Sequence, residues 1–154
     1  MTGWRIGYAA GNKEIIKKMK TLQSQSTSCA SSVSQYAAIS ALTQKCEELP
    51  KMNAEYKERH DYVVKELNNI PGVTCKETDG TFYVFPSFTK YIEESQKINN
   101  DDELAMYLLN EGKVAVVPGS AFGMSGHLRL SIALDLKSLE IAMNRIKKTL
   151  NNDE

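Results

Sequence analysis

The sequence predicts an α/β protein whose second part is a small sheet covered by helices. Stretches with helical spacing of apolar residues alternate with short aromatic or β-branched runs, in the order β-α-α-α and then β-β-α-β-β-α. The chain has 154 residues, of which 42% are hydrophobic and 25% charged. Such a composition is typical of a globular protein, and this length allows one substantial core.

The first third predicts one strand and two helices. Residues 4–10, WRIGYAA, are aromatic and apolar, and we interpret them as a strand that ends at a turn. A helix with Asn12 as its N-cap is expected next, because apolar residues recur there at helical spacing: Ile15, Ile16, Met19 and Leu22. The small polar side chains of residues 23–32 favour a loop or a weak helix start, and residues 33–45 are again helical in pattern. The first strand has no partner nearby and would need other strands to join.

The middle of the sequence predicts a long helix and a hairpin. The helix is expected to begin near Pro50 and to end at Pro71-Gly72. Its apolar residues recur every three or four positions: Met52, Tyr56, Val63, Leu67 and Ile70. The runs 73–77 and 81–88 are strand-like and are joined around Asp79-Gly80, which is a strong hairpin signal.

The last third predicts a helix, two strands and a final helix. Asp101 or Asp102 can cap the first of these helices, and Gly112 can close it. Residues 113–123, KVAVVPGSAFG, indicate a strand that runs into a glycine-rich loop. In HLRLSIAL, Leu128, Leu130 and Ile132 alternate with His127, Arg129 and Ser131, which is typical of a strand with two unlike faces. The final helix carries one apolar side: Leu139, Met143, Ile146 and Leu150.

Charge and cysteine content exclude several classes of function. Nineteen basic residues balance nineteen acidic ones, so no global field draws the chain to nucleic acid or to an anionic membrane. No apolar run approaches the roughly 20 residues that span a bilayer, and no signal sequence is recognised, so we expect a soluble cytoplasmic protein. Cys29, Cys46 and Cys75 are widely spaced and form no CxxC pair. We interpret them as buried free thiols and expect no disulfide and no metal site.

Two arginines are candidates for anion binding. Arg5 lies in the apolar first run, where an unpaired guanidinium would be costly, so it should meet an anion. That anion is either a carboxylate of the protein or a phosphate or carboxylate ligand. Arg129 faces away from the leucines of its strand and follows a flexible loop, and it is either solvated or salt-bridged, or it binds a ligand. Spacing alone does not indicate that the two arginines converge.

Several long motifs, in one order along the chain, carry a family resemblance. They are MTGWRIGYAAG at the start, GTFYVFPSF, VAVVPGSAFG and HLRLSIA. Together they resemble class I aminotransferases, which are pyridoxal-phosphate enzymes of fold type I, and the aspartate aminotransferase branch in particular. The resemblance extends over the whole chain and implies the fold of the C-terminal portion of such an enzyme.

The resemblance implies a role for each arginine. Arg5 matches the family arginine that binds the phosphate of pyridoxal 5′-phosphate, and Arg129 matches the one that binds the α-carboxylate of the substrate. Holding that carboxylate orients the α-C–H bond toward the cofactor. Phe82 and Tyr83 match a strand on the substrate side of the site, although packing remains the slightly favoured interpretation for both. Residues 25–32 resemble a segment that approaches the neighbouring subunit in the family's homodimer.

The resemblance also implies that the catalytic lysine is not among these residues. The family's Schiff-base lysine comes a few positions before the methionine that matches Met1, so we expect no catalytic residue in this chain. The lysines of the first helix match no catalytic motif and are typical of a solvated face: Lys13, Lys17, Lys18 and Lys20. Residues 1–49 are then a remnant of the large pyridoxal-phosphate-binding domain, and residues 50–154 are the small domain.

Two classes of function are compatible with these features. In the first, the chain is the C-terminal fragment of an enzyme that moves an amino group between an amino acid, with aspartate as the best guess, and a 2-oxo acid, with 2-oxoglutarate as the best guess. The fragment alone would be inactive without the lysine. In the second, the chain is a non-catalytic assembly or regulatory domain derived from an aminotransferase, and residues 1–48 dimerise or rearrange.

Overall fold

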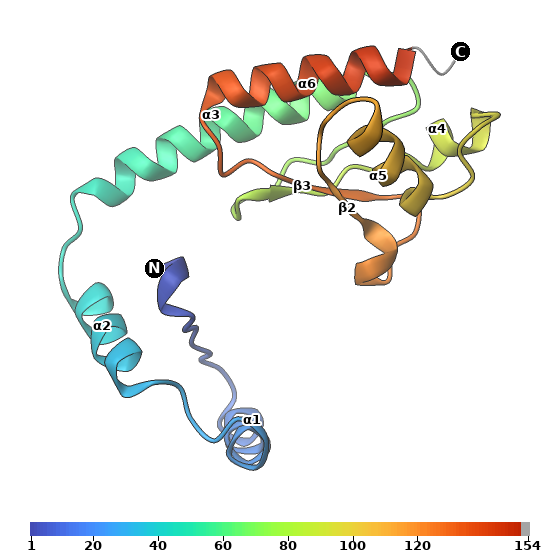
Figure 1. The fold of residues 1–154 in the computed structure, drawn as a ribbon. Coiled ribbons are helices and arrows are strands. Elements are labelled where there is room, and N and C mark those ends of the chain that lie inside the picture. The colour runs from blue at the N-terminus through green and yellow to red at the C-terminus, as the bar shows by residue number, and fades with distance from the viewer. Residues whose placement is uncertain (152–154) are drawn as a thin grey trace. The chain divides into compact units, whose positions relative to one another are not determined.

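The computed structural model describes residues 1–151 and contains both helices and strands (Figure 1). The chain divides into two compact units, Met1–Leu49 and Pro50–Glu154.

The first unit contains a short 3₁₀ turn, η1 (Thr2–Trp4), and two helices, α1 (Lys13–Ser26) and α2 (Ser32–Thr43). The predicted strand at residues 4–10 is wrong, since residues 5–10 form no ladder; a strand needs a neighbour, and this unit supplies none. Asn12 is confirmed as N-cap, because its side chain accepts the N–H groups of Glu14 at 2.9 Å and Ile15 at 3.4 Å. The helix α1 runs four residues into the predicted loop, where serine hydroxyls donate to carbonyls one turn back.

The long helix α3 (Glu48–Asn68) follows, with Pro50 in its first turn as predicted. The predicted hairpin after it is largely wrong. Only one isolated bridge, Thr74 to Ser87, joins the two runs, and residues 73–77 are not a regular strand. The Asn68 side chain accepts the N–H of Cys75 at 2.8 Å and donates to its carbonyl at 2.9 Å. Because Thr74 exchanges both of its backbone hydrogen bonds with Ser87, the backbone groups of Cys75 point away from the second run, and Asn68 satisfies that outer edge.

Three short strands form an antiparallel sheet in the order β1-β3-β2. They are β1 (Tyr83–Val84), β2 (Val117–Pro118) and β3 (Leu128–Ser131), so β3 lies in the centre. Tyr83 pairs with Ser131 on one side, and Val117 pairs with Arg129 on the other. The central strand is thus held by backbone hydrogen bonds along both edges.

The remaining elements are α4 (Thr89–Glu94), α5 (Asp101–Asn110), the 3₁₀ turn η2 (Gly119–Phe122) and α6 (Leu136–Asn151). Asn100, and not Asp101 or Asp102, is the N-cap of α5, because its side chain accepts the N–H of Glu103 at 2.8 Å. The helix ends two residues before Gly112, close to the predicted position. Figure 1 draws α6 alongside α3, and an ion pair between Lys147 and Glu66 joins the two helices.

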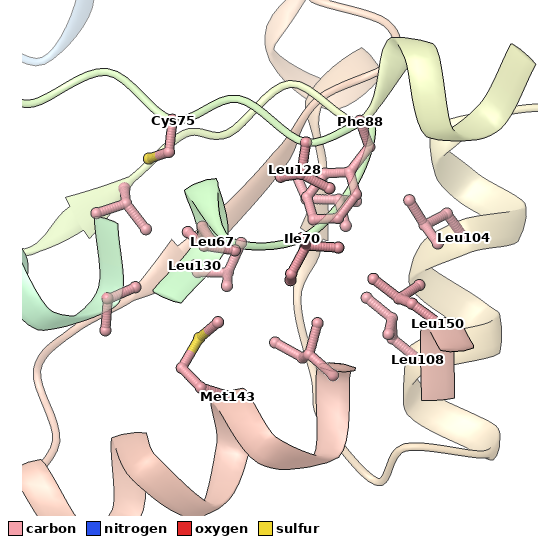
Figure 2. Close-up of a cluster of buried hydrophobic side chains, with 14 of the residues drawn as sticks. Leu67, Ile70, Cys75, Phe88, Leu104, Leu108, Leu128, Leu130, Met143 and Leu150 are labelled. Atoms are coloured by element: carbon pink, nitrogen blue, oxygen red, sulfur yellow. The ribbon is translucent and has the colours of Figure 1, made fainter. Parts of the chain in front are cut away.

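One hydrophobic core lies in the second unit (Figure 2). The predicted alternation of the central strand is confirmed, since Leu128 and Ile132 are fully buried, Arg129 is half-buried and Ser131 is exposed. The predicted apolar side of α6 is also confirmed by four buried residues: Leu139, Met143, Ile146 and Leu150.

The cysteine prediction is correct for only one of the three thiols. Cys75 is buried in the core, whereas Cys29 and Cys46 are exposed. Both exposed thiols lie outside the helices of the first unit, in which Ser34 is the one buried residue. A unit with so little interior offers no place to bury them.

Candidate anion-binding site

The central strand β3 fixes the backbone of Arg129. Leu128 and Leu130 on either side point into the core, so the strand's period of two directs Arg129 to the other face of the sheet. The side chain is half-buried there. The guanidinium of Arg129 is therefore carried by a strand whose backbone is hydrogen-bonded on both edges.

Two aromatic rings contact the Arg129 guanidinium. Its central carbon lies 4.5 Å from the ring centroid of Tyr83 in β1 and 4.4 Å from that of Phe122 in η2. Both distances are within the range of cation–π attraction. No carboxylate among residues 1–151 forms an ion pair with this guanidinium. Because its N–H donors lie in the guanidinium plane, they remain suited to a planar anion that approaches from the edge.

More aromatic side chains border this pair of rings. Phe85 stacks on His127, with ring centroids 5.3 Å apart, and meets Phe122 edge to face at 6.2 Å. The His127 ring is oriented by a 3.0 Å contact between its Nδ1 and the carbonyl oxygen of Ser125. Phe82 differs from these residues, because it packs against the core and contacts the Tyr83 ring at 4.3 Å. Of the two aromatic residues singled out in the sequence, Tyr83 contacts Arg129 and Phe82 packs.

A buried carboxylate holds the loop that carries Phe122. Asp101, which is 2% exposed, accepts the N–H of Ser120 at 2.7 Å and the N–H of Gly126 at 3.2 Å. Burial alone would raise the pKa of Asp101, but these two bonds, together with one from the Ser120 hydroxyl, outweigh it and lower the pKa below its ordinary value. The carboxylate therefore stays ionised while it braces the loop.

Arg5 differs from its predicted setting. We expected it to be buried in a strand, but it is exposed at the end of η1, with a left-handed backbone at φ 50 and ψ 42. No carboxylate among the described residues pairs with it. Without strand partners around residues 4–10, nothing in this unit covers the side chain. Arg5 belongs to the first unit and Arg129 to the second.

The sequence pattern does not indicate Phe122 or Asp101 as site residues. Phe122 is the aromatic residue of the glycine-rich loop, and an aromatic residue in such a loop, just before a strand with an unpaired cation, is a usable signal. Asp101 had been considered only as a helix cap. Its contact with Ser120 spans 19 positions and its contact with Gly126 spans 25, so no local pattern could reveal them.

Within residues 1–151, no group of three or more His, Cys, Asp or Glu side chains is arranged to hold a metal ion. None of the described helices combines the length and apolarity needed to cross a membrane.

The fold and this site define an α/β protein with an aromatic-bordered arginine suited to binding a small anion. Residues 1–146 match the family model "Aminotransferase class I and II", and the chain belongs to this family. The fold matches the corresponding part of fold type I aminotransferases, which confirms the predicted α/β class. Membership in the family implies pyridoxal 5′-phosphate as the cofactor.

Individual relatives support the same family. The chain is 45% identical over 148 residues to the aspartate aminotransferase of Bacillus subtilis, a match that covers 96% of this chain and 37% of that protein. It is 46% identical over 151 residues to the aspartate/prephenate aminotransferase of Cereibacter sphaeroides, covering 96% of this chain and 38% of that protein. The crystal structure of the aspartate aminotransferase from Rhizobium meliloti matches with a TM-score of 0.79 and 41% identity, over 98% of this chain and 39% of that one. The chain thus spans well under half the length of these relatives.

Proposed function

We propose that this chain supplies the substrate-carboxylate site of a pyridoxal-phosphate-dependent aminotransferase. The observation that carries the proposal is the Arg129 guanidinium on the central strand, bordered by the rings of Tyr83 and Phe122. Aspartate and 2-oxoglutarate are the proposed amino donor and acceptor, since the relatives from Bacillus subtilis and Rhizobium meliloti are named aspartate aminotransferases. The same resemblance supports residues 1–49 as part of the large domain and 50–154 as the small domain.

The mechanism assigns each arginine one task. Arg129 binds the α-carboxylate with two parallel N–H donors, and the two rings limit the angles at which its guanidinium can lie. Arg5 fits the cofactor's phosphate, since its exposed guanidinium has no carboxylate partner among residues 1–151. When bound, the cofactor supplies an electron-withdrawing ring that makes the α-C–H bond easier to break. We propose that the lysine that moves the proton comes from the part of the family fold that this chain does not span.

A homodimer in the cytoplasm is part of the proposal. Ile15, Met19 and Leu22 of α1 are largely exposed and form one apolar side, which supports an assembled state for the first unit. The exposed free thiols of Cys29 and Cys46 are typical of a reducing compartment. Sedimentation of the purified chain at several concentrations tests the assembly, and a monomer at all concentrations would contradict it.

A chimera tests the enzymatic part of the proposal. The portion of the Bacillus subtilis relative outside the matched region is joined to this chain, which replaces the matched region. We expect the chimera to transaminate aspartate with 2-oxoglutarate, and the chain alone to show no such activity. Activity of the chain alone would refute the proposal that the catalytic lysine lies in the part of the family fold that this chain does not span.

Two substitutions in the chimera test the arginines. Two charge-assisted hydrogen bonds at about 1.5 kcal/mol each amount to about 3 kcal/mol, so Arg129→Ala should lower kcat/KM about 100-fold while the cofactor is retained. Arg5→Ala should chiefly lower cofactor retention. Arg145→Ala is the matched control, because this arginine of α6 is exposed and its side chain donates to the carbonyl of Lys113, at 3.5 Å. If Arg129→Ala behaves like Arg145→Ala, the assignment of the carboxylate site is wrong.

A further inference from the structure

Asp101 is a buried ionised group that the proposed binding step leaves without a task. It occupies the first turn of α5, and its two carboxylate oxygens accept from different residues. Oδ2 accepts from the N–H of Ser120, and Oδ1 accepts from the N–H of Gly126. These residues lie on either side of Phe122 in the sequence. One carboxylate therefore ties both ends of the loop 120–126 to the same helix.

The position of Phe122 at the tip of the loop 120–126 depends on the hydrogen bonds at the base of the loop. Further backbone bonds close the base: Gly119 N–H donates to the His127 carbonyl at 2.7 Å, and Phe88 N–H donates to the Gly126 carbonyl at 2.7 Å. Phe122 at the tip is 51% exposed, and its ring meets Phe85 edge to face and lies over the Arg129 guanidinium. Because the Phe122 ring is not enclosed by the core, its place over Arg129 follows from the course of the loop backbone.

We propose that Asp101 is a positioning residue for Arg129, which fixes the loop 120–126 so that the Phe122 ring stays over the guanidinium. The functional consequence rests on the carboxylate-binding role proposed above for Arg129. Loss of the Asp101 bonds lets Phe122 move, and the guanidinium then loses one of the two rings that limit its orientation. Binding of the substrate's carboxylate weakens, although Asp101 never touches the substrate.

The acceptor character of the carboxylate is what the loop requires. An ionised carboxylate offers only acceptors, and the loop presents donors to it, namely the backbone N–H groups of Ser120 and Gly126 and the Ser120 hydroxyl. In Asp101→Asn, one oxygen becomes an NH₂ group that meets an N–H, so one of the two ties is lost without a change in side-chain size. Asp101→Ser is the second variant, because serine is accepted in a first helical turn but is too short to hold both N–H groups.

Glu103 provides a matched control in the same helical turn. Its carboxylate accepts the N–H of Asn99 at 2.8 Å and is exposed, and it makes no contact with the loop 120–126. Its pKa is lowered, first by that backbone bond and next by the Asn99 side chain. Glu103→Gln thus removes a charge from the same end of α5 and leaves the loop untouched.

The first experiment measures the guanidinium directly in the full chain. The Nε–H resonance of Arg129, assigned by its loss in Arg129→Lys, reports the rings above it. Phe122→Leu defines the position of the resonance without the Phe122 ring. We expect Asp101→Asn and Asp101→Ser to move the resonance toward that position, and Glu103→Gln to leave it in place. A resonance unchanged in both Asp101 variants, or moved equally by Glu103→Gln, would overturn the proposal.

The second experiment uses the chimera and separates binding from turnover. Asp101→Asn should raise the KM for aspartate about tenfold with kcat within about twofold, because the carboxylate contact weakens while the reacting groups stay intact. Since Asp101 acts through Phe122, the double variant with Phe122→Leu should be no worse than Phe122→Leu alone. Additive losses would overturn the positioning role. An inactive chimera would refute the proposed function instead, and the resonance in the chain alone would then decide the positioning role.

Discussion

Gly126→Ala tests the close packing of the loop 120–126 against Thr89. Gly123 and Gly126 both have a left-handed backbone, with φ of 75° and 72°. A side chain in this conformation costs about 1–2 kcal/mol at either position. At Gly126, an added Cβ would also lie 2.5 Å from the Thr89 hydroxyl oxygen, whereas at Gly123 it would meet nothing within 4 Å. Gly126→Ala should therefore cost about 1–3 kcal/mol more than Gly123→Ala in free energy of unfolding.

A double-mutant cycle isolates the contact with Thr89. Thr89→Ala removes the hydroxyl oxygen and leaves its Cβ 3.3 Å from the added carbon. Alone, this change should cost about 0.5–1.5 kcal/mol, because it loses the 3.0 Å hydrogen bond to the Ser87 hydroxyl. In the Thr89→Ala background, the excess cost of Gly126→Ala over Gly123→Ala should largely disappear.

Thiol labelling of Cys75 is the assay, because this core thiol is buried and reports opening of the second unit. Cys29 and Cys46 are replaced by serine so that they do not contribute. With a urea m-value of about 1–3 kcal/mol/M, a loss of about 3 kcal/mol lowers the midpoint of labelling by about 1–3 M. Equal midpoints for Gly123→Ala and Gly126→Ala would refute the argument from the Thr89 contact.

Three further predictions concern the second unit. Leu108→Ala should lower the free energy of unfolding in urea by about 2–5 kcal/mol, because this leucine is fully buried. Leu109→Ala should lower it by less than about 1 kcal/mol, because this leucine is 43% exposed. Equal losses would contradict the placement of Leu108 in the core. Burial raises the pKa of the Cys75 thiol from 9.0 to about 11, so the urea midpoint should fall as pH rises through this window, and fall less in Cys75→Ala. The pKa of Asp101 is lowered, so its stabilisation is present above pH 3.8 and lost as pH falls below it. The difference in urea midpoint between the chain and Asp101→Asn should shrink there, and a constant difference would argue against an ionised brace.

The sequence predicted those elements that local chemistry determines. Asn12 caps α1 because its side chain reaches the N–H groups two and three residues ahead, and β3 alternates because every second residue enters the core. Arg129 stood out for the same reason, as a cation on the polar side of an apolar strand. In each case the deciding contacts lie within a few residues or follow from a simple period.

The features that the sequence did not predict depend on distant partners. Residues 4–10 have strand-like composition, yet they form no ladder where no neighbour pairs with them. The run 73–77 has strand-like composition too, but only Thr74 within it pairs with the second run, and the Asn68 side chain occupies the outer backbone edge at Cys75. The sequence indicates Asp101 or Asp102 as a helix cap. In the structure, Asp101 instead holds the loop 120–126, because the N–H of Ser120, 19 positions away, donates to its carboxylate. Residue propensities do not include the effect of partners that are distant in the sequence.

The position of β3 in the middle of the sheet has a consequence for how the surroundings of Arg129 can change. The backbone that carries Arg129 is protected by pairing on both edges, whereas the Phe122 ring above it lies on a turn outside the ladder. Mutations in the turn can therefore alter the shape and polarity around the guanidinium at little cost to the strand. The surroundings of the guanidinium can thus change while the strand that carries it keeps its place in the sheet.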